Sequence, residues 1–161
     1  MAKYLIAYQT ATGTTQEIAM QLAQELSSLG QEAEAKPMQE VESLAGYDTV
    51  IAGAPINGMQ WLPTAQAFLQ KWGDEIRNTR FALFTVSYVA HCGRKMWQKI
   101  IRKGIGKLSA QYNAVATAHF RGRVEKALPK VPRMIFGIKD GTPLDLMDQQ
   151  EVKDWAAELV K

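Results

Sequence analysis

An apolar run, a loop rich in hydroxyl groups and an amphipathic segment follow one another at the start of the chain. Residues 4–8 (Tyr-Leu-Ile-Ala-Tyr) have the composition of a buried strand, and residues 9–15 (Gln-Thr-Ala-Thr-Gly-Thr-Thr) form the loop. Apolar side chains then recur at steps of three and four, which predicts a helix ending near Gly30. The residues on its apolar face are Ile18, Ala19, Leu22, Ala23, Leu26 and Leu29.

A loop that opens a helix in this way is a candidate anion site. The first backbone N–H groups of a helix have no partner inside the helix, and its dipole favours negative charge there. The loop adds hydroxyl donors but contains no Lys or Arg, so it would hold a phosphate through neutral groups. The alternative is that Thr14 or Thr15 only caps the helix.

The rest of the chain alternates strand-like and helix-like segments. Four further strands are predicted at residues 31–36, 49–53, 81–86 and 114–120, and the second of these runs is apolar throughout. A helix is expected to begin at Thr64, a basic helix to cover residues 94–107, and a last helix to follow Asp148 and Glu151, which resemble a capping box. This pattern indicates one α/β domain over residues 1–161, with a parallel sheet of five strands covered by helices on both faces.

In such a sheet a ligand binds at the carboxyl ends of the strands. Here those ends are the loops at residues 9–15, 54–62 and 87–93, which we expect to meet at one crevice. The first loop has one glycine and no lysine, which excludes a dinucleotide fingerprint and a nucleotide P-loop. Gly53 and Ala54 stand where a phosphoacceptor carboxylate would be needed, and no nucleophile elbow is present.

The threonine loop resembles the phosphate loop of the flavodoxin family. Its pattern is hydroxyl-x-hydroxyl-Gly-x-hydroxyl, with Thr10, Thr12 and Thr15 at the hydroxyl positions, and the order of elements is similar over nearly the whole chain. Residues 50–56, residues 65–68 and the tryptophan of the last helix resemble the menaquinone-linked protoporphyrinogen oxidase branch. The resemblance implies a flavodoxin-like three-layer sandwich with strand order 2-1-3-4-5 and FMN as the cofactor.

By the same resemblance, the FMN phosphate would lie in the first loop and the flavin ring between the second and third loops. Apolar side chains from those loops suit the walls of a flat ring. The alternative for Trp61 and Tyr88 is ordinary core packing. The peptide around Asn57, Gly58 or Met59 is a candidate to accept the proton on N5 of a reduced flavin. The predicted cofactor-binding residues are Thr10, Ala11, Thr12, Gly13, Thr14, Thr15, Pro55, Ile56, Asn57, Gly58, Met59, Trp61, Ser87, Tyr88 and Val89.

Charge is unevenly distributed along the chain. The net charge is only +3, but residues 93–139 hold twelve basic residues and one acid, Glu125. Such a stretch favours an acidic partner or an anionic membrane surface, and the alternative is a solvated helix face. The second and third loops contain no acid, Arg94 and Lys95 follow closely, and His91 can add charge at lower pH. We therefore expect a higher second reduction potential than in acidic flavodoxins, and no nucleic-acid partner.

The remaining reactive residues predict neither a metal site nor a disulfide. Cys92 is the single cysteine, and His91 and His119 are too few to hold a metal. Arg94 and Lys95 could lower the pKa of the Cys92 thiol, but a structural cysteine is the preferred interpretation. The start of the chain does not resemble a signal peptide, and no apolar run could span a bilayer. We expect a cytoplasmic protein, with peripheral contact to the inner face of the membrane as a further hypothesis.

Three functions remain open from the sequence. The first is an FMN-dependent oxidoreductase, similar to protoporphyrinogen oxidases, that passes electrons from a substrate to a quinone or another acceptor. The second is a flavodoxin-type electron carrier between protein partners, and the third is a binding module without a cofactor. The sequence identifies no catalytic residue of the chain itself, and it leaves the electron donor, the acceptor, a porphyrin substrate and the oligomeric state open.

Overall fold

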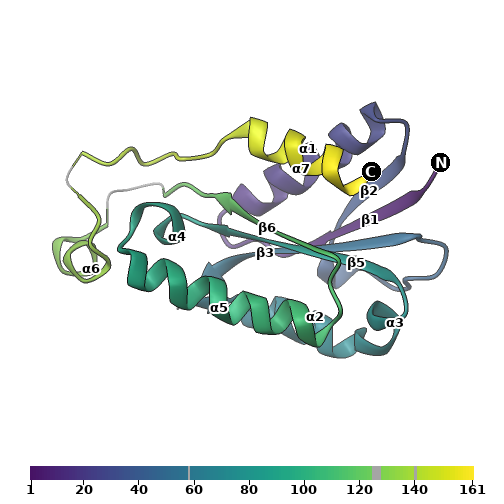
Figure 1. Ribbon diagram of the computed structural model, residues 1–161, viewed down its shortest axis with the longest axis horizontal. Helices are drawn as coiled ribbons and strands as arrows, with labels where there is room; N and C mark the ends of the chain where they lie inside the picture. Colours follow the sequence, from purple (N-terminus) through teal and green to yellow (C-terminus); the bar gives the residue numbers. More distant parts are fainter. Residues whose placement is uncertain (58, 125–127, 140) are drawn as a thin grey trace.

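A computed structural model describes residues 1–57, 59–124, 128–139 and 141–161. Its centre is a parallel sheet in the order β2-β1-β3-β5-β6, with a short strand β4 paired antiparallel to β3 (Figure 1). The predicted order 2-1-3-4-5 of the five parallel strands is thereby confirmed. The strands are β1 (Lys3–Tyr8), β2 (Glu32–Pro37), β3 (Thr49–Asn57), β4 (Gln60–Trp61), β5 (Arg80–Ser87) and β6 (Ala116–Arg121).

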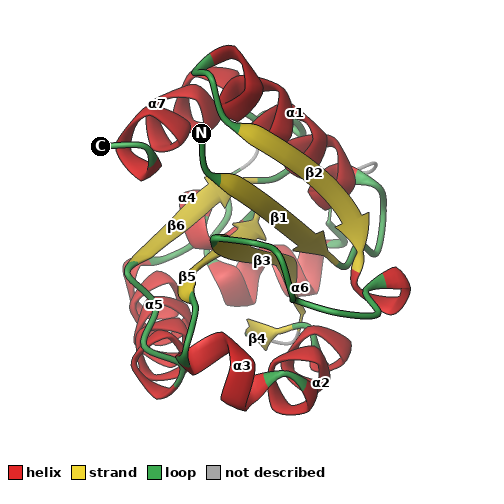
Figure 2. Cartoon of the chain, turned by 90° about the vertical axis from the view of Figure 1, so that its right-hand side faces the viewer, coloured by secondary structure: helices red, strands yellow, loops and turns green. Residues whose placement is uncertain are grey.

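Helices cover both faces of the sheet (Figure 2). On one face α1 (Thr14–Ser28) packs beside α7 (Gln149–Leu159), and on the other lie α2 (Pro63–Lys71), α3 (Gly73–Arg77) and α5 (Lys95–Gln111). Successive side chains of a strand point to opposite faces. In β1, accordingly, Tyr4 and Ile6 belong to the core under α1 and α7, while Leu5 and Ala7 belong to the core on the other face.

The carboxyl ends of the parallel strands lie at one edge of the sheet, and this arrangement assembles the site. Tyr8 at the end of β1 pairs with Gly53 of β3, and Gly53 pairs with Phe84 of β5. A Cβ atom on Gly53 would lie 1.9 Å from Cζ of the buried Phe84 ring, so only glycine leaves room for that ring. The loops that leave these strands therefore start from one compact edge of the sheet.

Several element boundaries differ from those predicted. The strand predicted at residues 49–53 extends through Asn57, because Ala54 and Pro55 continue the pairing with β5, and Ile56 and Asn57 pair with β4 instead of forming a loop. The helix expected to begin at Thr64 begins at Pro63 without a side-chain cap, and the basic helix continues to Gln111. Asp148 does cap α7, where its Oδ1 accepts a hydrogen bond from the Gln150 N–H at 3.0 Å.

Short helices occupy two stretches that were predicted as loops, residues 37–46 and 87–93, and the segment after the last strand, which the sequence left without an assignment. These are the 3-10 helix η1 (Met38–Glu40), α4 (Val89–Cys92) and α6 (Lys130–Phe136). Helix α6 lies beyond the carboxyl ends of the strands, near the start of α5 (Figure 1). In the part of the chain that the structure describes, no helix has the length and apolar character to cross a membrane.

Candidate functional site

The threonine loop is held in shape by its own side chains. Gly13 has a left-handed backbone (φ 92°), and its N–H donates to the Thr10 Oγ1 at 2.8 Å. Gly13 is also the N-cap of α1, and no side chain caps the helix there. The alternative that Thr14 or Thr15 is only an N-cap is therefore wrong, because both belong to the first turn of the helix.

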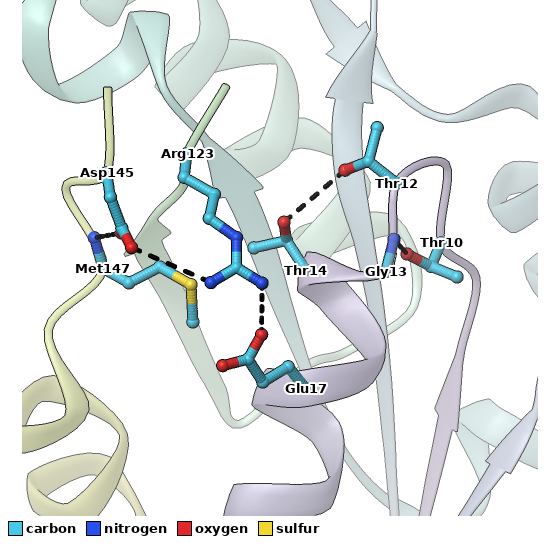
Figure 3. A network of polar contacts seen from close by, with 8 residues as sticks. All are labelled: Thr10, Thr12, Gly13, Thr14, Glu17, Arg123, Asp145 and Met147. Carbon is cyan, nitrogen blue, oxygen red and sulfur yellow. Dashed lines mark hydrogen bonds and ion pairs between the residues drawn. The ribbon is translucent and has the colours of Figure 1, made fainter. Parts of the chain in front are cut away.

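The hydroxyl groups of the loop divide into two kinds. Thr12 is exposed, and its Oγ1 lies 3.5 Å from the Oγ1 of the buried Thr14 (Figure 3). Thr15 is only 1% exposed, in the first turn of α1, and the Thr10 Oγ1 already accepts a hydrogen bond from the Gly13 N–H. Thr12 and Thr14 are thus the two threonines of the loop that line the cavity, next to the start of α1, where the first N–H groups of a helix have no partner inside the helix.

The second loop is a β-hairpin rather than an irregular loop. Ile56 pairs with Trp61 and Asn57 with Gln60, and Met59 turns the chain with a positive φ of 67°. Trp61 is 1% exposed, and its Nε1–H donates to the Ala54 carbonyl at 3.0 Å. Its indole therefore packs in the core, as the alternative interpretation predicted, and does not form a wall of the cavity. Gly58, and with it the predicted peptide flip, lies outside the described residues.

The third loop places an aromatic side chain at the edge of the site. Tyr88 is 8% exposed, and its hydroxyl donates to the Pro143 carbonyl at 2.7 Å. Burial raises the pKa of this phenol above its usual value, so it stays a neutral donor. The Oγ of Ser87 accepts from the Ala90 N–H at 3.1 Å and thereby starts the turn into α4. The side chain of Val89 lies outside the described part of the structure.

The three loops enclose one cavity of about 360 Å³. Nine of the fifteen predicted residues line it: Ala11, Thr12, Thr14, Pro55, Ile56, Asn57, Met59, Ser87 and Tyr88. Among the other described candidates, Thr10, Gly13, Thr15 and Trp61 lie outside the wall. The cavity has hydroxyl groups at one end and mostly apolar side chains along its length.

Six further residues line the same cavity and were not predicted from the sequence. Val86 and Ile101 come from the sheet and α5, whereas the others come from the segment that follows β6. The sequence signal for these four residues was the interleaving of basic and apolar side chains in that segment. The six are Val86, Ile101, Arg123, Val124, Leu128 and Phe136.

Two histidines and the cysteine beside the site are held in their neutral forms. Burial, reinforced by the Arg102 charge, lowers the pKa of both His91 and His119 to about 4. The positive charge that His91 was expected to add at lower pH therefore appears only near pH 4. The His119 ring lies 2.9 Å from the Thr85 Oγ1. Burial also raises the pKa of Cys92, whose thiol donates to the Tyr88 carbonyl, and this disfavours a reactive thiolate.

Comparison with known proteins agrees with this geometry. A family profile described as a flavodoxin domain matches residues 5–130. The chain belongs to the flavodoxin domain family. The resemblance inferred from the threonine loop is thereby confirmed, and the matched region contains the three loops, β6 and Arg123 but not α7.

The comparisons include curated proteins similar in sequence and solved structures similar in fold. The protoporphyrinogen IX dehydrogenase [quinone] of Escherichia coli strain K12 is 33% identical over 90 residues, which are 55% of this chain and 50% of the relative. The chain thus spans about half the length of that curated relative.

Solved structures confirm the flavodoxin fold. A two-electron reduced Megasphaera elsdenii flavodoxin has a TM-score of 0.61 at 15% identity, covering 96% of this chain and 98% of the other. The Fusobacterium nucleatum flavodoxin bound to flavin mononucleotide has a TM-score of 0.57 at 14% identity, covering 99% and 98%.

Proposed function

We propose that this flavodoxin domain binds FMN and works as an oxidoreductase that passes electrons from a substrate to a quinone or another acceptor. The observation that supports it most directly is the cavity at the sheet edge, with Thr12 and Thr14 at one end and Tyr88 and Phe136 among its walls. When bound, the flavin would supply the redox chemistry, because its ring accepts and donates electrons.

The residues present fit such a cofactor. A volume of about 360 Å³ in the described structure lies within the range of small-molecule sites. Ile56 and Met59 supply apolar surface for a flat ring, and Asn57 supplies backbone and amide groups for its polar edge. The hydroxyl end of the cavity coincides with the start of α1, which suits a phosphate group.

The oxidoreductase function is favoured over a plain carrier by the surface next to the cavity. On α5 and α6 several large apolar side chains are exposed: Met96, Ile100, Val131, Met134 and Ile135. Basic residues surround them in sequence, from Arg94 to Lys139. An apolar patch with a basic surround suits an anionic membrane surface, where a quinone would be reached, better than it suits a basic redox protein.

The first test is the visible absorption spectrum of the purified chain before and after FMN is added. We expect bound-flavin bands at about one FMN per chain, since the three loops form a single crevice. A protein that gains no bound flavin would refute the proposal and favour a binding module without a cofactor.

A second test separates the oxidoreductase from the carrier. The flavin-loaded chain is mixed with liposomes containing anionic lipid and a quinone, at low and high salt. We expect binding that weakens with salt, together with reduction of the quinone by the reduced protein. Val131→Ser with Ile135→Ser should weaken liposome binding, whereas Met20→Ser, an exposed apolar residue on α1, serves as the control. Fast electron exchange with a reductase and none with quinone would instead favour the carrier.

A further inference from the structure

An arginine from a distant part of the sequence reaches the threonine loop. Just after β6, Arg123 forms an antiparallel bridge with Asp145, flanked by hydrogen bonds from the Val124 N–H to the Leu144 carbonyl at 2.9 Å and from the Leu146 N–H to the Gly122 carbonyl at 3.1 Å. These backbone contacts fix where the side chain starts.

Two carboxylates then fix where the side chain ends. The Arg123 guanidinium donates to the carboxylate of Glu17 in the first turn of α1, and its Nη1 lies 3.8 Å from the Asp145 Oδ2. Figure 3 shows the guanidinium between these two acids, beside Thr14 and Thr12. Asp145 is itself held by the Met147 N–H, which donates to its Oδ1 at 2.9 Å. The cation is thus positioned by two different segments.

The same side chain lines the cavity at its hydroxyl end. Arg123 shares the cavity wall with Ala11, Thr12 and Thr14, the residues of the loop and the helix start. The loop has no basic residue of its own, and a phosphate monoester carries nearly two negative charges at neutral pH. A guanidinium has five N–H donors, so pairing with two carboxylates leaves donors for a third anion.

We propose that Arg123 is the cationic part of the phosphate site and makes the chain prefer FMN over riboflavin, which lacks the phosphate. This rests on the proposed FMN function. The competing account is that Arg123 only ties residues 122–124 and 144–146 to α1 through surface ion pairs, which contribute little free energy. That account predicts no difference between the two flavins.

The test measures the dissociation constants of FMN and riboflavin by quenching of flavin fluorescence. For Arg123→Gln we expect FMN to bind about tenfold more weakly or worse, because a charge-assisted hydrogen bond is lost, with riboflavin nearly unchanged. Arg123→Lys should restore part of the FMN affinity. Arg121→Gln is the matched control, because Arg121 is the neighbouring arginine that pairs with Glu151 at 2.7 Å and does not line the cavity.

A double variant tests whether Arg123 contacts the FMN phosphate directly or only neutralises the charge of Glu17. If Arg123 contacts the phosphate, Glu17→Gln should keep or strengthen FMN binding, and Glu17→Gln with Arg123→Gln should bind as weakly as Arg123→Gln alone. Recovery of wild-type FMN affinity in the double variant would overturn the proposal, since Arg123 would then only neutralise Glu17. Equal weakening of FMN and riboflavin by Arg123→Gln would also overturn it. If the wild-type chain binds neither flavin, the proposed function itself has failed.

Discussion

The two ends of the cavity are built in different ways. The hydroxyl end comes from one contiguous stretch, in which Thr12, Gly13 and Thr14 take their positions from a local turn and the first turn of α1. The opposite wall is assembled from segments far apart in sequence, with Phe136 brought against α5 by its ring contact to Trp97 at 5.7 Å between centroids. A contiguous motif encodes its own shape, whereas an assembled wall depends on tertiary packing.

The largest effect is expected in the buried sheet from which the loops of the site start. Gly53→Ala would put a Cβ atom 1.9 Å from Phe84 Cζ, in a core with no room for the ring to move. Overpacking of this kind costs about 1–3 kcal/mol of unfolding free energy. For a chain of this size that lowers Tm by roughly 2–12 °C, which thermal unfolding would detect.

A matched control for this variant lies on α5. A Cβ atom on Gly104 would meet nothing within 4 Å, and alanine is about 1 kcal/mol more favourable than glycine inside a helix. Gly104→Ala should therefore leave Tm unchanged or raise it. If Gly53→Ala were equally harmless, the close packing under the site would be wrong.

The two ends of the cavity should respond differently to FMN and to riboflavin, which lacks the phosphate. Thr12→Val removes a hydroxyl at the hydroxyl end and should weaken FMN by about 1.5–3 kcal/mol, roughly 10- to 100-fold, while riboflavin is little affected. Phe136→Ala removes apolar wall and should weaken both flavins alike by about 1 kcal/mol. Titration of both flavins against both variants measures the difference.

A threonine away from the cavity provides the control for the comparison of Thr12 with Phe136. Thr79→Val removes a hydroxyl that donates to the Glu75 carbonyl, away from the cavity, and should change neither affinity. Should Thr12→Val weaken riboflavin as much as FMN, the hydroxyl end would not be the phosphate end.

The last prediction concerns the effect of acid on stability. The pKa of His91 and His119 is about 4 in the folded chain, below the roughly 6.5 of an unfolded chain. Between these values the unfolded state binds more protons, so their contribution to stability is complete above pH 6.5 and is lost as pH falls toward 4. His91 lies on α4 and His119 on β6, whereas the threonine loop has no titratable side chain.

His119→Gln tests this linkage. The variant keeps a polar partner for the Thr85 hydroxyl but cannot take up a proton, so its stability should fall less steeply with acid than that of the wild type. Urea unfolding midpoints at pH 7, 6 and 5 would compare the two slopes. Parallel slopes would show that His119 does not contribute to the acid sensitivity.

Much of this architecture could be predicted because the signals were local. Apolar runs and helical periodicity identified the five parallel strands and the main helices, and the threonine motif identified the family. The β3–β4 hairpin was missed because residues 54–57 have the composition of a turn, and they become a strand only through pairing of residues 54–55 with β5 and of residues 56–57 with β4. Trp61 could not be assigned for the same reason, since its burial depends on neighbours outside the loop.

The sequence by itself determined the strand–loop–helix unit and the order of elements, because backbone geometry and apolar periodicity act over a few residues. It also showed a basic segment after β6 without revealing which of its cations would face the loop. Only the tertiary structure selected Arg123, through backbone pairing with residues 144–146 and ion pairs to Glu17 and Asp145. Glu17 lies 106 positions from Arg123. Contacts between such distant residues arise when the packed sheet brings its strand ends to one edge, and no local pattern records them.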